Sequence, residues 1–196
     1  MKSLTLGLSG AAAAGTGATG YYIYQRSSSE TIQDKLSSLK LISSVSTNKE
    51  EVDKQWKEEF TIDKDAIKRV ITNIKDDSKG GEALSKWCQD NLTKPVSEPL
   101  LTNVKKWCFI GTIESKIKRN KTFIELGSTQ EWEGIWNKHT ETEKRSKVGL
   151  TEAQGSNTKD KDLKAIQDFC SENRKKDFLA KEKVTVYDEV VDWCTK

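Results

Sequence analysis

Hydrophobic positions recur at helical spacing through most of the chain beyond residue 48. In "NKEEVDKQWKEEF", Val52, Trp56 and Phe60 lie at i, i+4 and i+8, after a capping signal formed by Asn48 and Glu51. Stripes of the same period follow in "DKDAIKRVITNIKDD", "GEALSKWCQDNL", "PLLTNVKKWC" and "KDLKAIQDFCSENRKK". Each segment has one apolar face to bury, so the pattern predicts a series of amphipathic helices that pack on one another.

Two segments follow this pattern less cleanly. "KTFIEL" alternates between polar and apolar residues, which is typical of a short strand, and "VTVYDEVVDWC" opens with β-branched residues before helical spacing resumes. Between them, "STQEWEGIWNKH" has a capping box from Ser128 to Glu131 and a helical face with Trp132, Trp136 and His139. The predicted fold class is therefore mainly α, with a short strand pair as an added feature.

The N-terminus has a different pattern, because residues 3–25 carry no charge. A run of this length meets the roughly 20 residues that cross a bilayer, and Tyr21, Tyr22 and Tyr24 suit an interfacial position. We interpret residues 1–26 as an uncleaved signal-anchor that forms a membrane-spanning helix. A cleaved signal peptide and a soluble Gly/Ala leader are the alternatives.

Residues 27–47 are rich in serine and are predicted to be a polar spacer. Ile32, Leu36 and Leu39 within this stretch share a helical stripe, which allows a short helix there. We expect the globular body to begin near Asn48.

Landmarks of the first half return in the second half in the same order. Each of the four cysteines follows an aromatic residue, and "WCQDN" in the first half matches "FCSEN" in the second. The offsets are about 80, 82 and 86 residues, for Trp56 with Trp136, Trp87 and Cys88 with Phe169 and Cys170, and Trp107 and Cys108 with Trp193 and Cys194. This order predicts two related helical modules, at residues 48–118 and 119–196, whose aromatic landmarks form a core motif.

The cysteines have two interpretations. They are either buried small hydrophobic residues in a reducing compartment or two disulfides in a secreted protein. Their even number, their equal placement in the two modules and the apparent export signal favour disulfides. Because duplicated modules should each close on themselves, we expect Cys88 to pair with Cys108 and Cys170 with Cys194.

Composition and spacing argue against several classes of site. The 33 Lys and Arg against 30 Asp and Glu are mixed along the chain, so we expect no nucleic-acid partner. No two cysteines have the spacing of a structural zinc site, and the single histidine, His139, is assigned a core-edge role. We predict no catalytic, metal or cofactor-binding residues. An enzyme with a ligand pocket at Trp132 and Trp136 is the alternative, but a core stripe explains these rings more simply.

The sequence gives two opposed signals for the side of the membrane on which the body lies. Arg26, Lys35 and Lys40 after the apolar run outnumber Lys2 and the amino terminus, and that count alone keeps the body in the cytoplasm. A short basic leader before an apolar run indicates export instead. The disulfide interpretation of the cysteines agrees with export.

Several stretches resemble the large paralogous families of uncharacterised proteins in haemotrophic mycoplasmas. They are the apolar segment ending in "YYIYQRSSSE", a Trp followed about thirty residues later by "LSKWC", then "KKWCFIGTIESKI" and a closing "DWCTK". The resemblance spans essentially the whole chain, and its motifs are structural, so it transfers no catalytic residue. Phe169 departs from the more usual Trp of the pattern.

The resemblance implies a membrane-anchored, surface-displayed protein, with paralogue variation that implies immune evasion or host contact. We therefore expect a non-enzymatic, single-pass protein of the cell membrane with an extracellular body and no cofactor. Its expected partners are the membrane, through the N-terminal helix, and host surface or immune proteins. The alternative is a membrane-tethered cytoplasmic module that binds protein.

Overall fold

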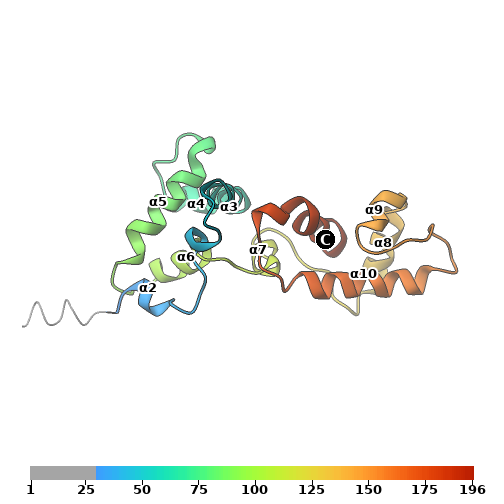
Figure 1. Ribbon diagram of the computed structural model, residues 1–196. Coiled ribbons are helices and arrows are strands. Elements are labelled where there is room, and N and C mark those ends of the chain that lie inside the picture. The colour runs from blue at the N-terminus through green and yellow to red at the C-terminus, as the bar shows by residue number, and fades with distance from the viewer. Residues whose placement is uncertain (1–29) are drawn as a thin grey trace, which may run out of the picture.

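The computed structural model describes residues 30–196 of the chain, which fold into short helices packed in two groups (Figure 1). This confirms the mainly helical fold class. The signal-anchor predicted at residues 1–26 lies outside the described residues. Within residues 30–196, no helix is both long enough and apolar enough to span a bilayer.

The first group contains α2 (Ile32–Lys35), the 3-10 helix η1 (Ile42–Ser44), α3 (Lys49–Ile62), α4 (Lys64–Val70), the 3-10 helix η2 (Asp77–Lys79), α5 (Gly80–Leu92) and α6 (Leu100–Trp107). The second contains α7 (Ile113–Ile117), α8 (Thr129–Lys138), α9 (Thr142–Ser146), α10 (Lys159–Asn173), the 3-10 helix η3 (Ala180–Glu182), the π-helical turn η4 (Lys183–Tyr187) and α11 (Asp188–Cys194). We call these groups module 1 and module 2.

Each module has its own hydrophobic core. One core uses buried side chains from Ile32 to Phe109, and the other uses buried side chains from Ile113 to Cys194. The predicted boundary between residues 118 and 119 is therefore wrong, because Ile113 and Ile117 of α7 are buried in the second core. The boundary lies near Gly111, where neither core contributes a side chain.

The polar spacer predicted at residues 27–47 is also wrong for its described part. Thr31 caps α2 through a capping box with Asp34, and Ile32, Leu36 and Ile42 are buried in the first core. Ser37, Ser38, Ser43 and Ser44 of this stretch are exposed. Serine-rich composition thus obscured a segment whose few apolar residues are sufficient to pack it against the core.

The two modules repeat the same long-range backbone hydrogen bonds. The Ile32 amide donates to the carbonyl of Lys94 at 3.0 Å, and the Ile113 amide donates to the carbonyl of Lys176 at 2.8 Å. The isolated antiparallel bridges match as well, in the pairs Thr31 with Pro95, Leu41 with Phe109, Thr112 with Asp177 and Phe123 with Thr195. "TIQDKL" in module 1 therefore matches "TIESKI" in module 2. The predicted strand at "KTFIEL" forms only the bridge at Phe123, so the strand pair is absent from the described residues.

A disulfide closes each module in the pairing expected from the repeat. Cys88 near the end of α5 is bonded to Cys108 after α6, with Cα atoms 5.6 Å apart. Cys170 of α10 is bonded to Cys194 of α11, with Cα atoms 5.7 Å apart. All four cysteines are buried. The disulfide thus links the end of α6 to α5 in module 1, and α11 to α10 in module 2.

We expect removal of either disulfide to destabilise its module by a similar amount. Cross-links that close loops with sequence separations of 20 and 24 residues contribute about 3 kcal/mol each in the chain-entropy description. The double variants C88S/C108S and C170S/C194S should each lower the free energy of unfolding by about 3 kcal/mol in urea titrations. Non-reducing peptide mapping that found a link between Cys88 and Cys170 would contradict the pairing.

Candidate functional site

The aromatic residues of the core motif lie in or against the two cores. Four are buried, namely Trp56, Trp107, Trp136 and Trp193, while Trp87 and Phe169 are partly buried. The Trp107 indole donates to Asp63 at 2.8 Å, and the Trp136 indole donates to Asp162 at 2.9 Å. Asp162 also accepts a bond from the buried guanidinium of Arg145 at 2.6 Å. These contacts tie the indoles of Trp107 and Trp136 to buried carboxylates of their own modules.

The contact between the modules is built around one carboxylate that is shielded from water. Glu59 of α3 is 0% exposed, and it accepts hydrogen bonds from Lys116 at 2.6 Å and Arg119 at 2.7 Å. Both cations belong to module 2. Burial lowers the pKa of Lys116, and the opposing attraction of Glu59 favours its charged form. Arg119 also donates to the backbone carbonyl of Lys106 at 2.5 Å.

Two amide side chains extend this joint. Gln55 donates to the carbonyl of Phe178 at 3.1 Å and accepts from the amide of Ala180 at 2.7 Å. Asn120 donates to the carbonyl of Ile62. α3 of module 1 therefore receives both α7 and the segment before η3 of module 2. We call this contact the joint.

In module 2, the position equivalent to Glu59 is occupied by His139. His139 lies 80 residues after Glu59, the same offset that relates Trp56 to Trp136. Its ring stacks on Trp193 with centroids 4.1 Å apart, and its Nε2 lies 3.4 Å from the carbonyl oxygen of Asp192. Asp192 is the counterpart of Lys106, whose carbonyl accepts from Arg119 in the joint. The core-edge position predicted for His139 agrees with this burial.

Two lysines surround the same position in module 2. Lys138 and Lys144 each donate to the Asp192 carboxylate at 2.7 Å. Partial burial opposes ionisation of Asp192, but these hydrogen bonds outweigh it and lower its pKa to about 2. The charges at this end of module 2 are therefore paired within the module.

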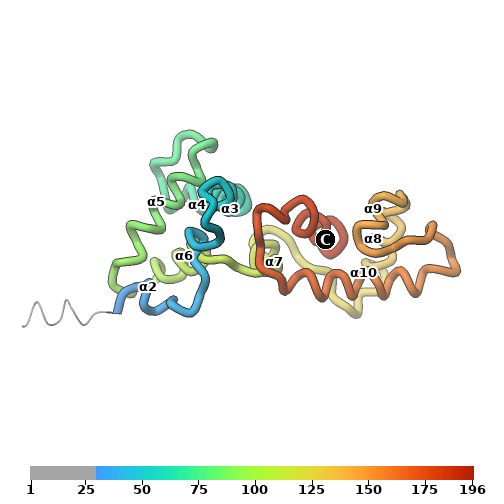
Figure 2. Tube along the Cα trace, viewed as in Figure 1, coloured from blue at the N-terminus to red at the C-terminus, as the bar shows by residue number. Residues whose placement is uncertain are grey.

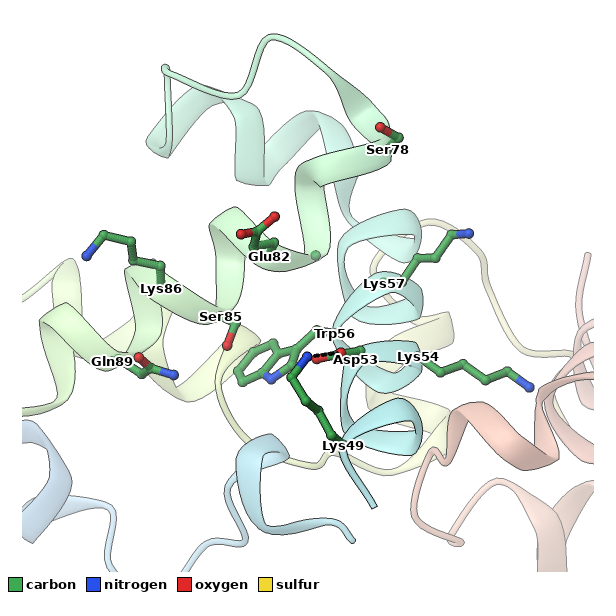
Figure 3. A pocket seen from close by; sticks show the side chains of 11 residues that line it. Lys49, Asp53, Lys54, Trp56, Lys57, Ser78, Glu82, Ser85, Lys86 and Gln89 are labelled. Atoms are coloured by element: carbon green, nitrogen blue, oxygen red, sulfur yellow. Dashed lines mark hydrogen bonds and ion pairs between the residues drawn. The ribbon is translucent and has the colours of Figure 1, made fainter. Parts of the chain in front are cut away.

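An open cleft of about 850 Å³ runs between α3 and α5 (Figure 3). Trp56 lies at its floor, and Lys49 at its edge is paired with Asp53 at 2.6 Å. Figure 3 shows Lys54 and Lys57 pointing away from α5, so the cations around the cleft do not converge on one point. Gly81 allows the close approach of the two helices, because a Cβ there would lie 2.8 Å from the backbone nitrogen of Lys57.

The rings proposed as an alternative ligand pocket lie in the core. Trp132 and Trp136 are 2% and 8% exposed, and the Trp132 indole donates to the carbonyl of Glu125. Within residues 30–196, no group of His, Cys, Asp and Glu side chains has the arrangement of a metal site.

The sequence did not identify the joint residues Gln55, Glu59, Lys116 and Arg119. Their partners are more than 50 residues away, and on an amphipathic helix a buried charge looks like a solvated one. One signal in the sequence could have located the joint. "TIESKI" repeats the Thr, Ile and Lys of "TIQDKL" at the same positions, which places α7 at the start of module 2. Compared with protein-family models, curated proteins and solved structures, the chain has no match.

We expect loss of the Glu59 charge to weaken the joint strongly. E59Q removes the carboxylate partner of the buried Lys116 and leaves Arg119 with only Asp63, 3.8 Å away, and removal of one partner of a buried ion pair typically costs about 3–5 kcal/mol in free energy of unfolding. D53N, which breaks the exposed pair of Lys49 with Asp53 on the same helix, is the matched control and should change stability little. Equal unfolding midpoints for the two variants would show that the joint contributes little.

The burial of His139 predicts a pH-dependent stability of module 2. Burial lowers the pKa of His139, while Asp192 raises it and Lys138 and Lys144 lower it further. The unfolded chain therefore binds a proton more readily, so this contribution is complete above about pH 6.5 and is lost as the pH falls through the lowered pKa of the folded state.

H139F keeps an aromatic ring against Trp193 and removes the titration. We expect its unfolding free energy to fall less between pH 7 and pH 5 than that of the native chain. Thermal unfolding across this range provides the measurement. Parallel profiles for the two proteins would exclude His139 as the source of the pH dependence.

Proposed function

We propose that the chain is a non-enzymatic, single-pass membrane-anchored surface protein whose two modules are displayed outside the cell in a host-contact or variable-antigen role. The observation that carries this proposal is the disulfide in each module. Disulfides persist in oxidising environments and are rare in the cytosol. Two separate disulfides, each in its own core, therefore favour a body that has been exported.

The N-terminal sequence and the resemblance supply the anchor in this proposal. Residues 3–25 are uncharged and are long enough to cross a bilayer. The resemblance to paralogous families of haemotrophic mycoplasmas supports surface display, in cells that have no wall between the anchored body and the host. The two modules held by the joint would then present one extended surface.

A membrane-tethered cytoplasmic module is the second candidate. The basic residues Arg26, Lys35 and Lys40 after the apolar run favour it. The two candidates differ in two measurable properties, which are the side of the membrane that carries the body and the redox state of the four cysteines.

The test uses intact cells that make the full chain. A membrane-impermeant amine reagent should label lysines of the body in intact cells to about the same extent as in lysed cells. A cytoplasmic lysine-rich protein in the same cells, which should be labelled only after lysis, is the control. Under denaturing conditions, a maleimide should add to none of the four cysteines before reduction and to all four after it.

Labelling of the body only after lysis, together with four free thiols, would support the cytoplasmic candidate and overturn surface display. Labelling in intact cells together with free thiols would support surface display but remove the disulfides as evidence for it. The two measurements therefore separate location from redox state.

A further inference from the structure

Module 2 contacts module 1 through one face. Module 1 has an equivalent face, and none of the described residues cover it. In module 2 this side consists of the end of α7 and the segment before η3, which contact α3. Backbone bonds identify the matching positions. The amides of Leu39 and Asn120 donate to the carbonyls of Leu36 and Ile117, and the amides of Val96 and Phe178 donate to Glu30 and Gly111.

Two matched pairs differ strongly in exposure. Phe178 is 0% exposed beneath the joint, whereas its counterpart Val96 is 36% exposed, and Lys116 is 1% exposed, whereas its counterpart Lys35 is exposed. Leu39, at 37%, and its counterpart Asn120 are both exposed. Pro95 is exposed beside Val96. The surrounding lysines are exposed as well. We call this surface the Leu39 face, and it consists of Lys35, Leu39, Lys40, Lys94, Pro95 and Val96.

The chain meets the Leu39 face directly after the apolar segment. The carbonyl of Glu30 accepts from Val96 on this face, and only residues 26–29 separate Glu30 from the uncharged run 3–25. Five peptide steps from Gln25 to Glu30 span at most about 18 Å. Figure 2 shows that the described chain begins beside α2, at the end of module 1 remote from α8 and α9. An anchored chain therefore holds this face close to the bilayer.

We propose that the Leu39 face rests on the lipid surface. Leu39 and Val96 enter the interfacial layer, and Lys40 and Lys94 extend toward lipid phosphates with their stems along the apolar surface. The acidic groups of this region have local partners, because Asp34 accepts a hydrogen bond from the Thr31 hydroxyl and Glu30 pairs with Lys35 at 3.5 Å. This inference rests on the membrane anchor of the proposed function.

The contact would fix the orientation of the body as well as its attachment. Module 2 lies on the other side of α3 from α2 and extends away from it (Figure 1). With the Leu39 face on the lipid and the joint rigid, α8, α9 and α10 form the end most distant from the membrane.

Photo-cross-linking of the full chain tests this contact. p-Benzoylphenylalanine replaces Leu39 or Val96, and in matched controls it replaces Leu126 or Val184, which are 63% and 70% exposed. Each protein is reconstituted in vesicles of phosphatidylcholine and phosphatidylglycerol with a tagged acyl chain. Thermal unfolding and intact disulfides establish that each variant folds.

We expect positions 39 and 96 to give at least about five-fold more lipid adduct than positions 126 and 184. Equal yields at all four positions, in a chain that resists extraction with alkaline carbonate, would overturn the lipid contact and leave the anchor intact. Covalent dimers through position 39 or 96 would overturn it in favour of a second copy. Extraction by carbonate would overturn the anchor itself, and this inference with it.

Discussion

A carboxylate removed from water needs a counter-charge, and the arrangement of this molecule follows from how Glu59 obtains one. Glu59 is 0% exposed, and its two cationic partners, Lys116 and Arg119, belong to the other module. Separation of the modules would break both ion pairs, and a shifted packing that kept these charges buried but unpaired would be strongly unfavourable. The joint therefore favours one relative placement of the modules, and the amide bonds of Gln55 add directional contacts to it.

Because the two modules are related, the surface of each module that lies outside the joint can be compared with the surface that forms the joint in the other. Repeat proteins end in units whose outer surface differs from the internal contact. On the outer surface of module 2, the polar groups are paired within the module. His139 occupies the position of Glu59, and Asp192 is paired with Lys138 and Lys144. Among residues 30–196, nothing closes module 1 in this way, because Val96 is 36% exposed where its counterpart Phe178 is buried. The asymmetry favours an occupant at the module 1 end and none at the other.

The sequence predicted the features that have a local signature. The helical spacing of Leu84, Trp87 and Cys88 indicates one buried face, and the repeated order of cysteines led to the pairing that the structure contains. The module boundary and the joint have no such signature. Ile113 and Ile117 have the same helical spacing whichever core they enter, and the partner of Glu59 is 57 residues away. Tertiary contacts determine both the module boundary and the joint. Within the sequence, only the match of "TIQDKL" with "TIESKI" indicates where the second module begins.

The same comparison explains why a stretch rich in serine is structural. Thr31 and Thr112 each cap a short helix by accepting from a backbone amide three residues on, and each helix is followed by an amide that donates to the carbonyl of a disulfide cysteine. The first residues of each module are thus bonded to its last residues. In module 1 this closure has a further consequence, because Ile32, only seven residues after the apolar run, belongs to the core. The body would then be joined to the membrane through a folded edge, and an orientation set at α2 is transmitted through the joint to module 2.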